Sequence, residues 1–168
     1  QRFHLTISER VDLFPEVVPI EVSPSLAGYL EKSVPLALGV NTEKMRSELI
    51  IAPILLEVFR LRDYQITLFS GIEFNVNPDD GLTGICDFLI SGDEHLSFVG
   101  LPVLIIVEAK KESITGGYAQ CIATMLAAQR FNAKDDPERE HDAVYGAVTT
   151  GNQWKFLKLH AQTAYIDW

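Results

Sequence analysis

The chain has 168 residues, of which 14 are basic and 23 acidic, and its formal net charge at pH 7 is −9. Apolar residues make up 47 % of it and charged residues 22 %, values typical of one soluble globular domain that can bury its own core. The acidic balance argues against a protein that coats nucleic acid through a broad basic face, although it leaves room for a local basic channel.

Membrane and secretory classes are also disfavoured. The longest apolar run, residues 49–58, is interrupted by Pro53 and Glu57 and is too short to span a bilayer. The N-terminal residues lack the pattern of a secretory signal. Cys86 and Cys121 form no Cys-x-x-Cys pair, and we interpret both as free thiols in a reducing cytoplasm.

The N-terminal 40 residues predict only short elements. Residues 3–7 alternate between apolar and polar side chains, which indicates an edge strand. Several prolines follow, and residues 25–33 are compatible with a short helix capped by Ser23 or Ser25.

A long helix is predicted from residue 43 to about Arg62, with Thr42 as its N-cap. Pro53 should bend this helix, because proline removes a backbone donor and clashes with the preceding turn. Its apolar residues recur at the three- and four-residue spacing of a buried face. The members of this predicted face are Met45, Leu49, Ala52, Leu56 and Phe59.

The apolar period then changes to two, which is typical of strands. Three strands, a helix and two further strands are predicted at residues 66–76, 84–90, 101–109, 113–132, 143–149 and 154–159. Short turns make the first three strands an antiparallel meander, and the crossover helix allows the next strand to run parallel. The predicted fold is α/β, a mixed β-sheet flanked by helices. We expect a single domain over residues 1–168, with a core at about 43–160 and an N-terminal extension at 1–42.

Two acidic residues stand inside apolar strands, where burial is costly without a partner. Asp87 lies within the second predicted strand, and Glu108 closes the third and is followed by Ala109 and Lys110. Glu108 and Lys110 point to the same face of a strand. Two carboxylates from neighbouring strands can hold a divalent cation, and a lysine beside them can stabilise charge on a phosphoryl group. Alternatively, Glu108 and Lys110 mark the exit of the strand into solvent, and Asp87 pairs with Lys110.

Two helical residues complete the candidate set, each with an alternative. Glu48 has apolar neighbours at helical spacing, so it either lies at the mouth of a cleft or simply favours the positive end of its helix. Gln120 lies near the start of the helix after Lys110, beside a stripe of alanines suited to close packing on a sheet. It is either directed toward the strand end or is a surface glutamine.

The order of these residues resembles the PD-(D/E)XK nuclease superfamily, which has a restriction-endonuclease-like core. The motifs that carry the resemblance are a Gly-x-x-Asp strand at 84–87, a Glu-Ala-Lys strand end at 108–110 and a helix with Gln120. The nuclease domains of type I restriction motor subunits, and related uncharacterised bacterial proteins, are the most similar in pattern. The resemblance covers roughly residues 43–149.

The resemblance implies Mg²⁺-dependent (or Mn²⁺-dependent) hydrolysis of DNA phosphodiester bonds. Asp87, Glu108 and Glu48 would bind the metal, Lys110 would activate or position the attacking water, and Gln120 would hold the nucleophile or Glu108 in place. DNA is the expected partner, with RNA, a homodimer and a protein partner left open. The alternative is a catalytically inactive interaction or regulatory domain on the same fold.

Overall fold

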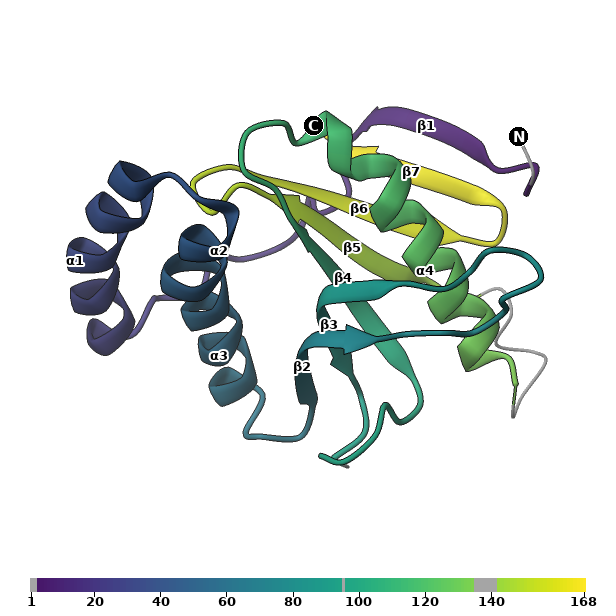
Figure 1. Ribbon diagram of the computed structural model, residues 1–168, viewed down its shortest axis with the longest axis horizontal. Coiled ribbons are helices and arrows are strands. Elements are labelled where there is room, and N and C mark those ends of the chain that lie inside the picture. Colours follow the sequence, from purple (N-terminus) through teal and green to yellow (C-terminus); the bar gives the residue numbers. More distant parts are fainter. Residues whose placement is uncertain (1–2, 95, 135–141) are drawn as a thin grey trace.

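The computed structural model describes residues 3–94, 96–134 and 142–168. Within them, the strands are β1 (Thr6–Val11), β2 (Thr67–Glu73), β3 (Ile85–Ser91), β4 (Val103–Ala109), β5 (Val144–Thr149), β6 (Trp154–His160) and β7 (Thr163–Asp167). The helical segments are α1 (Pro24–Val40), α2 (Glu43–Arg46), the π-helical turn η1 (Ser47–Ile51), α3 (Ala52–Leu61), the 3-10 turn η2 (Thr115–Gly117) and α4 (Tyr118–Asn132). The strands form one sheet in the order β1-β7-β6-β5-β4-β3-β2 (Figure 1).

The sheet is mixed in direction. β2, β3 and β4 form an antiparallel meander, and β5 runs parallel to β4 after the crossover through α4. β5, β6 and β7 are antiparallel neighbours, and β1 closes the far edge parallel to β7. The predicted α/β class, the meander and the parallel crossover are therefore confirmed. β1 and β7 lie outside the range predicted for the core, yet they belong to the same sheet.

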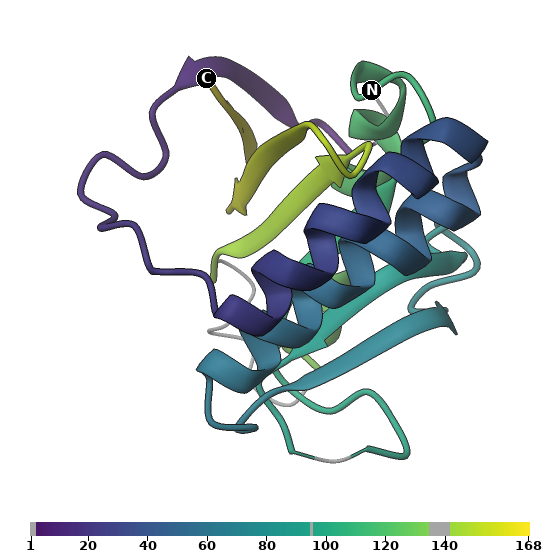
Figure 2. The ribbon, with the colours of Figure 1, turned by 90° about the vertical axis from the view of Figure 1, so that its left-hand side faces the viewer.

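Helices cover both faces of the central strands. α4 lies on one face and packs against Ile106 and Val148, whereas α3 lies on the other face with Val107 and Ala147 (Figures 1 and 2). Because successive side chains of a strand point to opposite faces, a strand covered on both sides is apolar throughout. The apolar sequence of β4 has this origin, as predicted.

The long helix predicted from residue 43 is present as the continuous run α2, η1 and α3. Thr42 caps it through a hydrogen bond from the backbone N–H of Met45 to Oγ1, at 3.2 Å. The distortion expected at Pro53 takes the form of the wide turn η1, and Pro53 lies in the first turn of α3.

The face that this run buries differs from the prediction. Leu56, predicted to be buried, is 56 % exposed. The residues that are buried here are Ile50, Ile51 and Leu55. The reason is the wide turn η1, which shifts the angular position of the following residues relative to a regular helix of 3.6 residues per turn.

α1 is longer than the predicted helix at 25–33. Ser23 caps its start, as expected, and the helix continues through Pro35 to Val40. Pro35 removes one backbone hydrogen bond, but α1 packs against η1, where the Ser33 hydroxyl donates to the carbonyl oxygen of Leu49 at 2.8 Å. Tertiary contact therefore maintains a helix that local propensity alone would end.

The N-terminal and C-terminal strands, β1 and β7, pair with each other at one edge of the sheet. β1 confirms the predicted edge strand, although it begins later, at Thr6, and its partner β7 was not predicted. Between β1 and α1, residues 12–23 run as an open arc (Figure 2). Cys86 and Cys121 are free thiols, as predicted, and both are buried. Among the described residues, none of the helices is both long and apolar enough to cross a membrane.

Candidate active site

The candidate site lies where β3 and β4 separate, at the C-terminal end of β4. The regular pairing of the two strands ends at Phe88 and Val107. Asp87 and Glu108 are the next residues beyond that pair. The backbone N–H of Ala109 donates to Oδ2 of Asp87 at 2.8 Å. The carboxylate thus accepts a hydrogen bond beyond the point where the pairing of the two strands ends. Asp87 is thereby held beside β4 at the level of Glu108.

Glu108 and Lys110 form an ion pair on the face of β4 that is covered by α4. Glu108 is only 2 % exposed, and the ammonium Nζ of Lys110 donates to its Oε1 at 2.5 Å. The same ammonium donates to Oε1 of Gln120, on the first turns of α4, at 3.2 Å. The structure thus brings together four of the five predicted residues: Asp87, Glu108, Lys110 and Gln120.

Gly117 lets α4 begin close to this group. A Cβ atom at residue 117 would lie 2.5 Å from Cγ1 of Val148 and 3.2 Å from Cγ of Lys110. No larger residue fits without displacing one of these side chains. Gly117 therefore allows α4, which carries Gln120, to begin close to the lysine.

The electrostatics of the four residues follow from burial. Burial raises the pKa of Glu108 to about 7, against the hydrogen bond from Lys110 that lowers it, and nearby Asp87 adds to the increase. Burial alone would lower the pKa of Lys110, but the hydrogen bond and charge of Glu108 outweigh it, and the net shift is upward. Lys110 is therefore cationic at neutral pH, whereas Glu108 changes its protonation there.

Glu48 is not part of this group. It lies in a groove between α1 and α3, its side chain is 59 % exposed, and it pairs with Lys44 at 3.7 Å. The acidic residue that reaches the site from this helical run is Glu43, whose charge contributes to the raised pKa of Lys110. The sequence signal for Glu43 was its place directly after the N-cap Thr42, where the helix starts.

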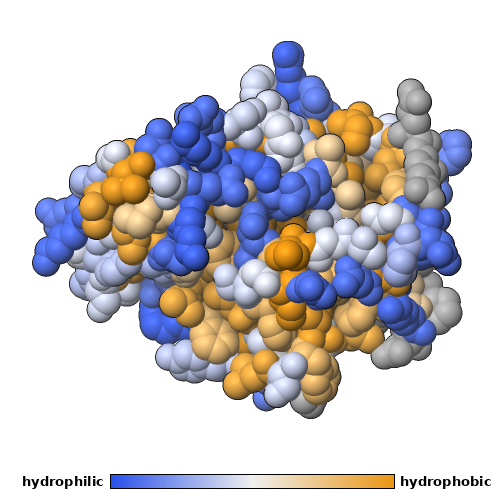
Figure 3. Space-filling model, viewed as in Figure 1, coloured by the Kyte–Doolittle hydropathy of each residue, from blue (hydrophilic) through white to orange (hydrophobic). Residues whose placement is uncertain are grey.

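Other cations near the strand ends are held by local partners. Arg46 donates to the carbonyl oxygen of Thr150, just beyond β5, at 2.7 Å, which ties α2 to this end of the sheet. Lys111 pairs with Glu112 at 3.1 Å. In the view of Figure 3, hydrophilic side chains dominate the upper part of the molecule, where α2 and the β4–α4 connection lie.

The donor set at the site suits a hard divalent cation. Asp87 and Glu108 offer carboxylate oxygens, the ligands that Mg²⁺ and Mn²⁺ prefer. Burial is the main cause of the raised pKa of Glu108, and the charge of nearby Asp87 adds to it; a cation beside Glu108 would favour its ionised form. In the described part of the chain, no group of three or more His, Cys, Asp or Glu residues is arranged to hold a metal ion.

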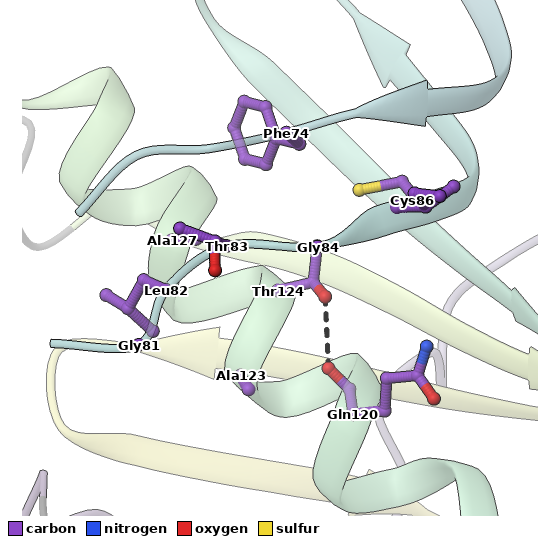
Figure 4. Close-up of a pocket in the computed structure, with 11 residues that line it drawn as sticks. Phe74, Gly81, Leu82, Thr83, Gly84, Cys86, Gln120, Ala123, Thr124 and Ala127 are labelled. Carbon is purple, nitrogen blue, oxygen red and sulfur yellow. Dashed lines mark hydrogen bonds between the residues drawn. The ribbon is translucent and has the colours of Figure 1, made fainter. Parts of the chain in front are cut away.

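A pocket of about 240 Å³ lies beside Gln120, the one residue of the four that lines it. One wall is the chain from Gly81 to Cys86, which leads into β3, and the other is the side of α4 that carries Gln120, Ala123, Thr124 and Ala127 (Figure 4). Phe74 closes its inner end. Gln120 belongs both to this pocket and to the lysine contact.

Comparison with family models, curated proteins and solved structures finds no match to this chain.

Proposed function

We propose that the chain is a metal-dependent endonuclease-like domain that hydrolyses DNA phosphodiester bonds, with Mg²⁺ or Mn²⁺ as cofactor. One observation carries the proposal. Asp87 on β3 lies beside Glu108 and Lys110 at the end of the neighbouring strand β4, and Gln120 of α4 contacts the lysine. The same residues carry the sequence resemblance to the PD-(D/E)XK superfamily.

The roles of the side chains follow from their positions. Asp87 and Glu108 would hold the metal, which when bound acts as a Lewis acid on the phosphoryl oxygens. Lys110, cationic at neutral pH, would orient the attacking water and stabilise the negative charge that develops on the phosphate. Gln120 accepts a hydrogen bond from Lys110, so its proposed role is to position the lysine rather than Glu108.

The proposed function also implies a substrate and a cellular compartment. DNA is the preferred substrate and RNA the variant to compare with it. The buried free thiols support a reducing, cytoplasmic compartment.

The proposal is tested by plasmid cleavage with purified protein. We expect supercoiled DNA to be nicked in the presence of Mg²⁺ or Mn²⁺ and to remain intact in EDTA. Lys110→Met should abolish nicking, because it removes the cation at the site. Lys111→Met is the matched control, since Lys111 is the adjacent residue and pairs outward with Glu112. If wild-type protein cleaves no form of DNA with either metal, the proposal is wrong.

A second candidate function is a non-catalytic interaction domain. The observation that favours it is a set of exposed apolar side chains on the open arc of residues 12–23 before α1. Val17, Val18 and Ile20 are each at least 66 % exposed. Phe14, shortly before them in the chain, lines an apolar groove of about 600 Å³ between α3 and the sheet. Such surface on a soluble chain is typical of a protein-binding site. A partner that is bound equally by wild type and Asp87→Asn would support this reading.

A further inference from the structure

The pocket beside Gln120 has the chemistry of a site for an uncharged, flat group. None of its lining side chains carries a full charge, and they combine apolar surface with hydroxyl groups. They are Phe74, Leu82, Thr83, Ile85, Cys86, Gln120, Ala123, Thr124 and Ala127, with Gly81 and Gly84. Burial, followed by the charges of the two acids, raises the pKa of Cys86 to about 12, so its thiol is neutral. A phosphate would find no counter-charge inside this pocket.

Two polar groups of the pocket are available for a ligand. Gln120 uses Oε1 to accept from Lys110, which leaves its amide NH₂ without a hydrogen-bond partner in the described part of the chain. The Thr83 hydroxyl, which points toward α4, also makes no hydrogen bond within the described residues (Figure 4). Thr124, by contrast, uses its hydroxyl to donate to the backbone carbonyl of Gln120 at 3.1 Å. The pocket therefore offers an amide donor and a hydroxyl group above an aromatic end wall.

Size and position restrict the occupant. The volume of about 240 Å³ is below the usual range for drug-sized ligands and suits a single nucleoside. Gln120 links the pocket directly to Lys110, where the proposed function places the reacting phosphate. The sugar and base attached to that phosphate are then the nearest substrate groups to the pocket mouth.

We propose that this pocket receives the unpaired base of the nucleotide next to the cleaved phosphate, so that the substrate class is DNA with unpaired nucleotides, such as single strands, flaps and gaps. The inference rests on the proposed function. A base that is stacked and paired in a duplex cannot enter a walled pocket without being extruded, which costs unpairing and unstacking energy. A single strand has no such cost, and its bases bind through contact with apolar and aromatic surface.

The test fills the pocket without touching the four site residues. Ala123→Leu places a larger side chain in the pocket wall. Ala119→Leu is the matched control, because Ala119 is exposed one turn earlier on α4 and does not line the pocket. Anisotropy of a fluorescent oligonucleotide, single-stranded or duplex, is measured in EDTA at low salt, and cleavage of both forms is measured with Mg²⁺.

We expect wild type to bind the single strand about tenfold more tightly than the duplex, and Ala123→Leu to lose that difference while Ala119→Leu keeps it. Equal binding of the two forms, no binding of either, or equal effects of both variants overturns the inference. The two proposals fail separately. Binding that is sensitive to Ala123→Leu without any cleavage refutes the hydrolysis alone, whereas cleavage of both forms at equal rates, unchanged by Ala123→Leu, refutes the pocket alone.

Discussion

Replacing Glu108 by glutamine should change how the stability of the protein depends on pH. The carboxyl group of Glu108 has a pKa of about 7 in the folded chain and an ordinary value of 4.5 when unfolded. The folded state therefore binds this proton more tightly. The stabilisation is fully present below pH 4.5 and is lost as the pH rises through 7.

The size of the effect follows from that difference in pKa. It corresponds to about 3 kcal/mol of folding free energy, most of which is lost between pH 5 and pH 8. Glutamine is neutral at every pH and its carbonyl oxygen can still accept from Lys110. The Glu108→Gln variant should therefore not show this loss, and its stability relative to wild type should increase with pH.

The assay is urea unfolding in EDTA at pH 5, 6, 7 and 8. Glu94→Gln is the control, because Glu94 is exposed on the β3–β4 connection and its charge is not buried by folding. The quantity that decides is the difference in unfolding free energy between wild type and Glu108→Gln. If this difference changes by less than about 1 kcal/mol from pH 5 to pH 8, the account of a buried, proton-binding carboxyl is refuted.

Two further substitutions test the packing of α4, one beside the site and one at the opposite end of β4. Gly117→Ala should destabilise the fold by about 1–3 kcal/mol and slow cleavage, since its Cβ would meet Val148 at 2.5 Å and press on Lys110; unfolding and nicking assays measure both effects. Asn132→Leu should cost about 2–4 kcal/mol in urea unfolding, because Asn132 accepts from the backbone N–H of Val103 at 2.7 Å and donates to its carbonyl at 2.8 Å, in a buried position. Unfolding within about 0.5 kcal/mol of wild type would contradict either expectation.

Sequence patterns predicted the sheet well where the local signal was strong. The period of two and the apolar run at β4 are direct consequences of strand geometry and of cover on both faces, so β2 to β6 were identified in order. β7 was missed because it is only five residues long, Thr163–Asp167, although its burial alternates as in a strand. It pairs with β6 across a short turn and also with β1, and this second pairing joins opposite ends of the chain, which local patterns do not contain.

The prediction that Glu48 belongs to the site shows a different limit of sequence patterns. Counting at 3.6 residues per turn favoured Glu48, but the wide turn η1 changes the helical angle, and Glu48 lies in the groove toward α1. Glu43 is the helical acid whose charge acts on Lys110, and Arg46, the last residue of α2, ties this helix to Thr150 just beyond β5. Both facts depend on tertiary contacts. Asp87, Glu108 and Lys110 could be grouped from sequence because neighbouring strands impose a fixed geometry.

The most direct test of the central claim is a calorimetric titration of the protein with Mn²⁺ at pH 7.5. The claim is that Asp87 and Glu108 together hold a divalent cation. Wild type should bind Mn²⁺, Asp87→Asn should bind it about tenfold more weakly or worse, and Glu48→Gln should bind it like wild type. Unchanged binding by Asp87→Asn, or no binding by wild type, would contradict the claim.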